Sequence, residues 1–359
     1  MAREGDDMNN VVESIRMLSI RSKSKQPIEI IRNSTKPVRV AGPMVRYSKL
    51  PFRELVRFYD VDLVYTPMIL AREFVRNKVA RYSDFTTNIR DSPTIVQIGC
   101  NNSVDLLRMV DMIHPYVDGI SLNCGCPIKE QVREGIGAAL MTEPEKVSQM
   151  VRVVKEKYGD SVCVETKIRI HNDIQETIQF VEQVQNAGVD YITVHGRTKN
   201  TRSSKSVDLE SIRIIKEVAK VPVIANGDCV DLKSFEHILE VTKCDGVMSV
   251  RGLLENPSLF SGYDKTTWGC VERFFSLSMQ YGLPFRIIQH HLSCMTSQIF
   301  TKKEHLQLNQ CNNMIELLDY FDRDFELKRM GENGFGEDVE VRRRNPTASV
   351  EPSSRASKA

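Results

Sequence analysis

Short apolar segments alternate with longer amphipathic stretches between residues 38 and 250, and this alternation restricts the fold more than any other feature of the sequence. The apolar segments are predicted strands at 38–44, 63–67, 94–98, 119–122, 162–168, 191–195, 223–226 and 246–250. The stretches between them include predicted helices at 50–59, 103–113, 143–158, 174–187, 207–219 and 232–242. Strands that alternate with helices are typical of βαβ units, which pair their strands in a parallel sheet.

Eight strand segments within about 210 residues match the size of a (β/α)8 TIM barrel, toward the lower end of the usual range. The alternative is a doubly wound open sheet. A G-x-G-x-x-G sequence after the first strand would favour a dinucleotide-binding sheet of that kind, and none is present there. We therefore predict an α/β fold with a (β/α)8 barrel over residues 37–262.

The rest of the chain has a different pattern. Apolar residues recur at helical spacing over 270–280, 285–300 and 302–321, with no strand segment between them, which predicts a small all-α domain at 263–329. Residues 1–36 are polar and of mixed charge, and we expect a disordered or partly helical N-terminal arm. Residues 330–359 are rich in Gly, Glu, Arg, Ser and Pro, which indicates a disordered tail.

Composition narrows the class of protein without identifying it. The net charge of +2 gives no strong indication of nucleic acid, membrane or an acidic partner. Nine cysteines, an odd number scattered through predicted strands and helices, suit reduced thiols better than a disulfide scaffold. An acidic, polar N-terminus argues against a secretory or mitochondrial signal, and no segment has the roughly 18 apolar residues of a membrane span. We expect a cytoplasmic protein, with the nucleus as a second compartment.

Polar residues follow almost every predicted strand. In a (β/α)8 barrel the active site lies at the carboxyl ends of the strands, so these residues would meet around one rim. In strand order, the side chains concerned are Arg46, Gln97, Asn123, Cys126, Lys167, Arg169, His195, Arg197, Asn226, Asp228 and Arg251. One polar strand end means little, but this many around one ring predict a binding site.

The sequence Asn123-Cys-Gly-Cys-Pro127 ends the fourth strand abruptly. Gly permits a tight turn and Pro stops the strand, so the turn would bring a cysteine to the rim. The structural alternative is a turn with two buried thiols, because free cysteine is among the most buried residue types. A C-x-C zinc site is a poorer interpretation, since a structural zinc needs about four ligands and no partner pair is near in the sequence. No metal site is predicted.

The polar groups are of types that suit a phosphorylated, planar, nitrogen-rich cofactor. Gln97 can both donate to and accept from the edge of a heteroaromatic ring. Lys167 supplies a cation; the alternative for Lys167 is a buried ion pair with Glu165, which strand alternation places on the same face. The loops after the seventh and eighth strands are the usual phosphate site of barrel enzymes, and Arg251 would add charge-assisted hydrogen bonds there. We therefore predict flavin mononucleotide, FMN.

Eight motifs in a fixed order carry a family resemblance. They are AGPMV at 41–45, VQIG at 96–99, LNCGCP at 122–127, EGIGAAL at 134–140, KIR at 167–169, VHGRT at 194–198, IANGD at 224–228 and VRGLLENP at 250–257. With these motifs the chain resembles the tRNA-dihydrouridine synthases over about 38–260. The segment PMVRYSKL at 43–50 and the NCGCP form at 123–127 look most like the eukaryotic type-four subgroup, which acts on neighbouring uridines 20a and 20b of the tRNA D-loop.

The resemblance implies a role for each matching residue. Cys126 would be the catalytic acid, and FMN would be bound by Pro43, Met44, Val45, Gln97, Lys167, His195, Asn226, Gly227, Asp228, Val250 and Arg251. Candidate contacts to the tRNA substrate are Asn123, Lys129, Arg169 and Arg197. The family uses NADPH as reductant. The barrel would then be the flavin-binding catalytic domain and residues 263–329 the helical tRNA-binding domain.

The expected reaction is reduction of the uracil C5–C6 bond, with hydride added at C6 and a proton at C5. A thiol is a suitable acid, because its ordinary pKa of about 8.5 leaves it mostly protonated at neutral pH. Cys126 is preferred to Cys124 because it occupies the family's position. Two other functions stay open: an FMN barrel that reduces a small pyrimidine or enone, and a catalytically silent tRNA-binding protein. We expect a monomer whose partner is tRNA and which contacts no membrane.

Overall fold

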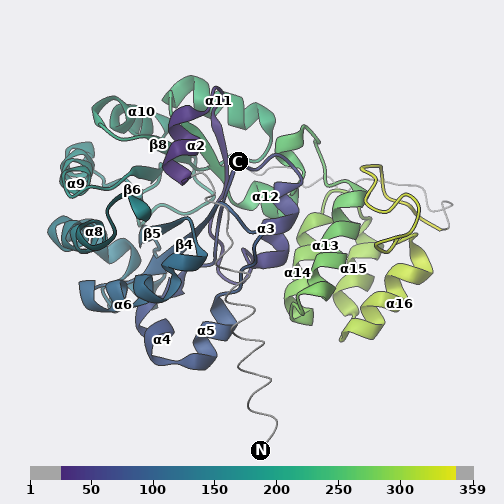
Figure 1. Ribbon diagram of the computed structural model, residues 1–359. Helices are drawn as coiled ribbons and strands as arrows, with labels where there is room; N and C mark the ends of the chain where they lie inside the picture. Colours follow the sequence, from purple (N-terminus) through teal and green to yellow (C-terminus); the bar gives the residue numbers. More distant parts are fainter. Residues whose placement is uncertain (1–25, 345–359) are drawn as a thin grey trace, which may run out of the picture.

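The computed structural model describes residues 26–344, in which a barrel of parallel strands stands beside a group of helices (Figure 1). The predictions for residues 1–25 of the N-terminal arm and for residues 345–359 of the tail lie outside this range. Within it, the longest helix has 15 residues, and none of the described helices is long and apolar enough to cross a membrane.

The strands form one closed parallel ring. They are β1 (Val38–Ala41), β2 (Leu63–Tyr65), β3 (Ile69–Leu70), β4 (Thr94–Gly99), β5 (Gly119–Cys124), β6 (Cys163–Arg169), β7 (Tyr191–His195), β8 (Val223–Asn226) and β9 (Gly246–Ser249). Their order is β2-β1-β9-β8-β7-β6-β5-β4-β3, and β2 also pairs with β4, which closes the ring. The two-residue β3 lies outside the ring on the end of β4. The predicted (β/α)8 barrel is confirmed, and the open sheet is excluded.

Helices surround the ring (Figure 1). They are α3 (Leu50–Arg57), α4 (Ala71–Arg76), α5 (Lys78–Asp84), α6 (Ser103–Ile113), α7 (Lys129–Arg133), α8 (Pro144–Tyr158), α9 (Ile174–Asn186), α10 (Leu209–Val218), α11 (Leu232–Thr242) and α12 (Arg251–Glu255). Short 3-10 turns occupy His114–Tyr116, Gly137–Thr142, Gly159–Ser161 and Leu259–Ser261. Side chains cap α6, α9, α10 and α11 at Asn102, Asp173, Asp208 and Asp231. The helices α4 and α5, which follow β2, are not among those predicted from the sequence.

Strand alternation produces two separate apolar regions. Residues that point outward, such as Val96 and Val247, pack against the helices in the larger core. Residues that point inward, such as Val40 and Leu63, fill the barrel. The helix α2 (Pro27–Asn33) adds Ile31 to this inner cluster and so packs against the barrel interior.

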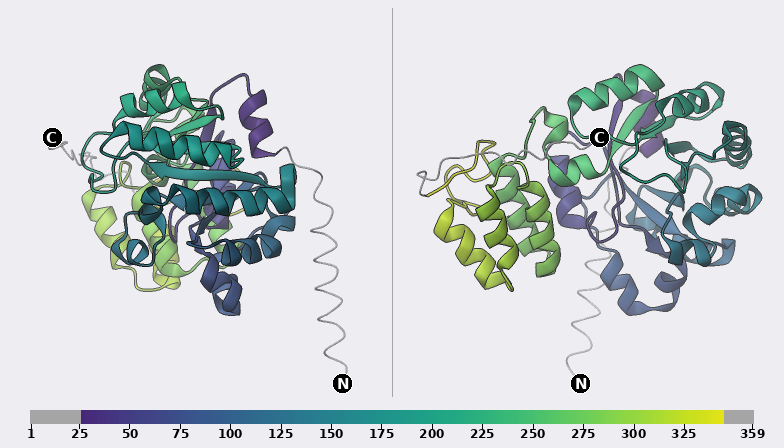
Figure 2. Two further views of the ribbon diagram at one scale, coloured as in Figure 1. Left: turned by 90° about the vertical axis from the view of Figure 1, so that its left-hand side faces the viewer. Right: turned by 180° about the vertical axis from the view of Figure 1, so that it is seen from behind.

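The helical part consists of α13 (Trp268–Gln280), α14 (Phe285–Met295), α15 (Lys302–Gln310) and α16 (Met314–Asp324). The right view in Figure 2 shows it to one side of the barrel, and in the left view it lies behind the barrel. The sequence predicted one helix over 302–321, but the chain leaves the helix at Cys311. Asn313 then caps α16 by accepting a hydrogen bond from the Glu316 amide at 3.0 Å. A single helix there is therefore wrong.

Residues 326–344 pack on the helical part, which corrects the predicted tail for residues 330–344. Glu272 of α13 is buried and accepts hydrogen bonds from the amides of Lys328 at 3.0 Å and Gly336 at 2.7 Å. Arg343 forms an ion pair of 2.6 Å with Glu304 of α15. The composition of this segment resembles that of a disordered chain, but its arginines form ion pairs with carboxylates that are distant in the sequence.

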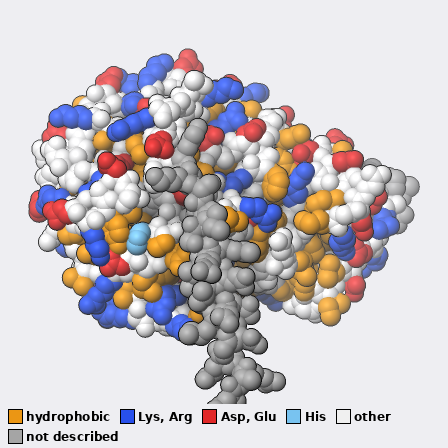
Figure 3. Space-filling view, viewed as in Figure 1, with side chains coloured by type: hydrophobic (Ala, Val, Ile, Leu, Met, Phe, Trp, Pro, Cys, Tyr) orange, Lys and Arg blue, Asp and Glu red, His pale blue; other side chains and the backbone are white. Residues whose placement is uncertain are grey.

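Polar contacts join the helical part to the barrel. The Tyr281 hydroxyl donates to Glu54 of α3 at 2.8 Å, and the Tyr59 hydroxyl, just after α3, donates to Asp338 at 2.6 Å. The buried His291 of α14 lies 3.2 Å from the Tyr47 carbonyl oxygen and contacts the Phe52 ring. On the face shown in Figure 3, basic and acidic side chains are interspersed over both parts.

A buried ion pair holds α3 against the loop that precedes β4. Arg53 and Asp91 are almost fully buried and approach to 2.6 Å. Arg53 also donates to the carbonyl oxygens of Ser48 at 2.8 Å and Thr86 at 2.6 Å. Burial alone would raise the pKa of the Asp91 carboxyl group, but Arg53 and Arg57 hold it below its usual range.

Asp91→Asn should lower the free energy of unfolding by about 3–5 kcal/mol, because it leaves the buried Arg53 charge without its counter-ion. The lowered pKa means that the ionised carboxylate stabilises the fold above the ordinary Asp pKa of about 3.9 and ceases to do so as the pH falls through the folded-state pKa. The difference between variant and wild type in urea unfolding should therefore shrink in acid. Asp160→Asn is the control, because Asp160 is fully exposed beside Lys155. Equal stability of wild type and Asp91→Asn near neutral pH would contradict this role.

Candidate active site

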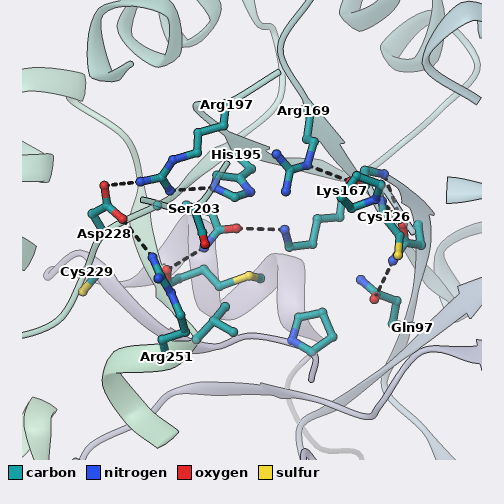
Figure 4. Close-up of a pocket in the computed structure, with 18 of the residues that line it drawn as sticks. Gln97, Cys126, Lys167, Arg169, His195, Arg197, Ser203, Asp228, Cys229 and Arg251 are labelled. Carbon is teal, nitrogen blue, oxygen red and sulfur yellow. Dashed lines mark hydrogen bonds and ion pairs between the residues drawn. The ribbon is translucent and has the colours of Figure 1, made fainter. Parts of the chain in front are cut away.

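A cavity of about 290 Å³ opens at the carboxyl ends of the barrel strands (Figure 4). It is lined by residues of β4 to β9, of the start of α12, and of the loops that follow β1, β2, β5, β7, β8 and β9. Of the predicted site residues, it is lined by Pro43, Val45, Gln97, Asn123, Cys126, Lys167, Arg169, His195, Arg197, Asn226, Gly227, Asp228, Val250 and Arg251. The structure thus brings together residues that are up to about 200 positions apart in the chain.

Two predicted site residues lie elsewhere. The Met44 side chain is buried in the apolar core, and its amide donates to the Ser48 hydroxyl at 2.8 Å. Lys129 is exposed on α7. The lining that the sequence reasoning did not assign to the site is Met68, Gly125, Pro127, Ser203, Cys229, Val230, Met248 and Gly252. Strand alternation on β9 could have found Met248, whereas nothing in the sequence marks Ser203.

Asn123, the penultimate residue of β5, organises the loop that carries the thiol. Its Oδ1 accepts hydrogen bonds from the amides of Gly125 at 3.1 Å and Cys126 at 2.9 Å. Its Nδ2 donates to Gln97 Oε1 on the neighbouring β4 at 2.8 Å. One side chain therefore fixes both the amide edge of Gln97 and the turn that exposes Cys126.

The two cysteines of this loop have different surroundings. Cys124 is fully buried in the core between the strands and the helices, where burial raises its pKa well above the ordinary value. Cys126 is partly exposed and lines the cavity. Gly137 packs closely behind it: a Cβ atom there would lie 2.6 Å from the Cys126 carbonyl oxygen, and its φ of +65° also favours glycine. The loop therefore exposes the Cys126 side chain to the cavity, whereas the Cys124 side chain is kept out of the cavity.

Lys167 crosses the cavity floor from β6 toward β8 (Figure 4). Its Nζ donates to Asn226 Oδ1 at 2.8 Å, and Asn226 Nδ2 donates to the Met248 carbonyl oxygen at 3.0 Å. Burial lowers the pKa of Lys167, while Glu165, two residues earlier on the same inward face, opposes this change. The structure thus places Lys167 and Glu165 on one face, as the alternation predicted, but the Lys167 ammonium group bonds to Asn226.

His195 lies among cations. Its Nε2 is 3.2 Å from Arg197 Nη1, so it accepts a hydrogen bond from the guanidinium group as a neutral imidazole. Burial, followed by the charges of Lys167, Arg169, Arg197 and Arg251, lowers its pKa to about 2. A neutral His195 can therefore offer a hydrogen bond to a ligand without adding a further positive charge.

Asp228 holds two arginines at the rim (Figure 4). Its carboxylate lies 2.5 Å from Arg197 Nη2 and 3.2 Å from Arg251 Nη2. Gly227 and Asp228 both have positive φ values, +134° and +52°, so the chain turns sharply directly after β8. A Cβ atom at Gly227 would lie 2.5 Å from Val207 Cγ2. This compact turn and the two guanidinium groups provide donors suited to an anion such as a phosphate.

Arg169 connects the thiol loop after β5 to the loop after β7. Its Nε donates to the Gly125 carbonyl oxygen at 2.8 Å, and its Nη1 donates to the Thr198 carbonyl oxygen at 2.9 Å. Apolar groups complete the cavity: Pro43, Val45, Met68, Met248 and Val250. The cavity thus offers an apolar wall for a flat ring, amides for a ring edge, cations for an anion, and one accessible thiol.

Fold and cavity together define a (β/α)8-barrel enzyme with its site at the carboxyl ends of the strands. A family model described as dihydrouridine synthase matches residues 39–351. The chain belongs to the dihydrouridine synthase family.

Three relatives share most of their length with this chain. A Saccharomyces cerevisiae protein named tRNA-dihydrouridine(20a/20b) synthase, with NAD(P)+ in its name, is 52% identical over 329 residues, which are 89% of this chain and 90% of the relative. The Schizosaccharomyces pombe protein of the same name is 47% identical and covers 89% of this chain and 98% of its own length. A human protein with this name followed by "like" is 43% identical, over 84% of this chain and 94% of its own length.

Asn123→Ala should lower the free energy of unfolding by about 2–4 kcal/mol, because it leaves two amides and the Gln97 oxygen without their partner. It should also speed alkylation of Cys126, because the loop is then free to open. Alkylation is best measured in a Cys294→Ser background, since Cys126 and Cys294 are the two cysteines that are not buried. Asn200→Ala in the exposed loop after β7 is the control. Unchanged stability and alkylation rate would show that Asn123 does not hold the loop.

Proposed function

We propose that this protein is an FMN-dependent tRNA-dihydrouridine synthase that reduces uridines 20a and 20b of the D-loop with NADPH as hydride source. The names of the yeast and human relatives support the reaction and the positions. The cavity supports it independently, because Cys126, Gln97 and Lys167 come from three different strands or their loops and line the same space. This convergence is the observation on which the proposal mainly rests.

The residues of the cavity fit FMN. The apolar side chains of Pro43, Val45 and Met68 suit the ring, and Gln97 and Lys167 supply hydrogen-bond donors for its polar edge. The turn at Gly227 and Asp228 with Arg251 suits the phosphate. FMN, when bound there, would supply hydride chemistry at C6 of uracil, with NADPH as the source of electrons.

In this reaction the protein's own side chains supply the proton. Reduction of C5–C6 requires a hydride at C6 and a proton at C5, and the Cys126 thiol gives the proton as general acid. The S–H bond breaks, a C5–H bond forms, and the thiolate later takes a proton from solvent. Lys167 and Arg169 of the neighbouring strand β6 line the same cavity as Cys126. Arg169 also holds the thiol loop through the Gly125 carbonyl oxygen.

The target uridine must leave the folded tRNA to reach this cavity, at a cost of a few kcal/mol for unstacking. We propose that the exposed Lys129 of α7 contacts tRNA, mainly through its shape and phosphates. Arg197 is buried and its guanidinium group donates to the Lys205 carbonyl oxygen, which argues against the expected tRNA contact at Arg197. The barrel at 37–262 would carry the chemistry, and the helical part from residue 263 would hold the tRNA. Its position beside the barrel supports this division (Figure 2).

Cys126→Ala should reduce the rate of dihydrouridine formation about 10²–10⁴-fold, because the enolate at C5 loses its proton donor. The protein should still bind FMN and tRNA. Cys124→Ala is the matched control two residues away: its thiol is buried in the core, so the variant should lose some stability but keep turnover. The measurement is dihydrouridine per tRNA by mass spectrometry under single-turnover conditions. Normal turnover by Cys126→Ala would remove the assignment of the acid.

The substrate class separates this proposal from the two other functions. Purified protein with FMN and NADPH should reduce unmodified tRNA at least about 10³-fold faster, at equal concentration, than free uracil or orotate, because binding energy from the rest of the tRNA positions the base. Equal rates would favour a small-molecule reductase. Tight tRNA binding without any reduction would favour the catalytically silent tRNA-binding protein.

A further inference from the structure

Glu165 lies inside the barrel just below the cavity, and the proposed reaction makes no use of it. It precedes Lys167 by two residues on β6, so both side chains point inward. Its neighbours in register are Ser121 on β5 and Tyr191 on β7. The side chain is fully buried. The carboxyl group therefore sits one layer beneath the ammonium group of Lys167.

The surroundings of Glu165 do not satisfy a carboxylate. Neither of its oxygens has a hydrogen-bond partner among the described residues. Burial dominates and raises the pKa of Glu165, although the hydroxyl groups of Ser121, Thr193 and Tyr65 lie near enough to favour the charged form, as does Lys167. A buried carboxyl group without good partners lowers the free energy of unfolding, and an apolar or amide side chain in a barrel core would lower it less. Such a group needs an explanation beyond packing.

Lys167 supplies that explanation. Its ammonium group has three N–H donors, and one of them is used on Asn226 Oδ1. Burial is the largest influence on the pKa of Lys167 and lowers it, Glu165 opposes this change, and Arg169 lowers the pKa further. Among the described residues, Glu165 is the one carboxylate whose charge acts appreciably on Lys167. Asp228, the acid at the rim, is already shared by Arg197 and Arg251.

Other ionisable groups face this pair from each neighbouring element. They are Arg169 on β6, Cys126 after β5, His195 and Tyr191 on β7, Tyr65 on β2, and the buried thiol Cys163 on β6. The Cys124 thiol points outward into the larger core, yet its pKa is also influenced by Glu165. Arg169 stays charged at any pH of interest, and His195 stays neutral because burial lowers its pKa to about 2. The neutral forms of the buried tyrosines and thiols are favoured by burial. Glu165 is therefore the group that can balance the Lys167 charge.

We propose that Glu165 is a positioning residue that keeps the Lys167 ammonium group charged and directed into the cavity when a planar ring fills the cavity and removes its water. The inference rests on the proposed function, because the ring is that of FMN. Two inward positions on one strand lie about 7 Å apart. At an effective dielectric constant of about 20, a carboxylate about 7 Å from an ammonium group favours the charged lysine by about one to two pH units.

The test is the dissociation constant of FMN, measured by fluorescence from about pH 7, above the second phosphate pKa of about 6, to about pH 10. In wild type the affinity should fall where Lys167 loses its proton. In Glu165→Gln, which keeps the shape but not the charge, the fall should begin about one to two pH units lower. Glu165→Asp should keep the wild-type midpoint. The same midpoint in Glu165→Gln and in wild type would overturn the proposal.

The Lys167→Arg variant identifies the titrating group. Lys167→Arg should bind FMN with a flat pH profile, both alone and combined with Glu165→Gln, because a guanidinium group does not titrate in this range. A fall that persists in Lys167→Arg would overturn the proposal. Glu165→Thr is a second neutral variant; if both neutral variants fail to fold while Glu165→Asp folds, Glu165 has a structural role and the proposal is wrong. Wild-type protein that does not bind FMN would overturn both this inference and the proposed function. Normal FMN binding with the same pH midpoint in Glu165→Gln as in wild type would overturn this inference alone.

Discussion

The pairing of β2 with β4 closes the barrel, and the arrangement of the whole site follows from it. It closes a sheet in which every strand is parallel, so all the carboxyl ends meet at one rim. Closure also fixes which residues face inward, because successive side chains alternate. Lys167 and Asn226 lie 59 positions apart in the chain, yet closure brings them to 2.8 Å. In an open parallel sheet the same strand ends would lie in a row along one edge and would not surround a common space.

The balance of charges inside the ring explains why the cations of the cavity form two pairs with different surroundings. Four cations surround it, and Asp228 neutralises two of them at the rim, where an anion can compete for the same guanidinium groups. The other two, Lys167 and Arg169, lie nearer the thiol, and Arg169 is held by carbonyl oxygens of two loops. Glu165 lies beneath Lys167 at the opposite end from the solvent. The site thus provides cations that can bind a phosphate and hold the thiol loop, and carboxylates balance part of their positive charge.

Much of the fold could be predicted from the sequence because the local signals are strong. The strands 191–195 and 223–226 and the helices 103–113 and 232–242 have the predicted bounds, since capping residues such as Asn102 and Asp231 mark where helices begin. Most of the candidate site could be predicted too, because a barrel tells where each strand end must lie. The misses depend on distant contacts. The end of α15 at Cys311 and the ion pair of Arg343 with Glu304 depend on tertiary contacts. No local sequence pattern indicates that Ser203 lines the cavity.

If the converging strand ends use a flavin to reduce a uridine of tRNA, the flavin itself should report the reaction. Its visible spectrum can be followed in the purified protein, reduced with NADPH without oxygen and then mixed with tRNA that lacks dihydrouridine. We expect the oxidised-flavin bands to return in step with formation of one dihydrouridine per flavin. A colourless protein that takes up no FMN, or a flavin that stays reduced with tRNA and is reoxidised by a small enone, would contradict this function.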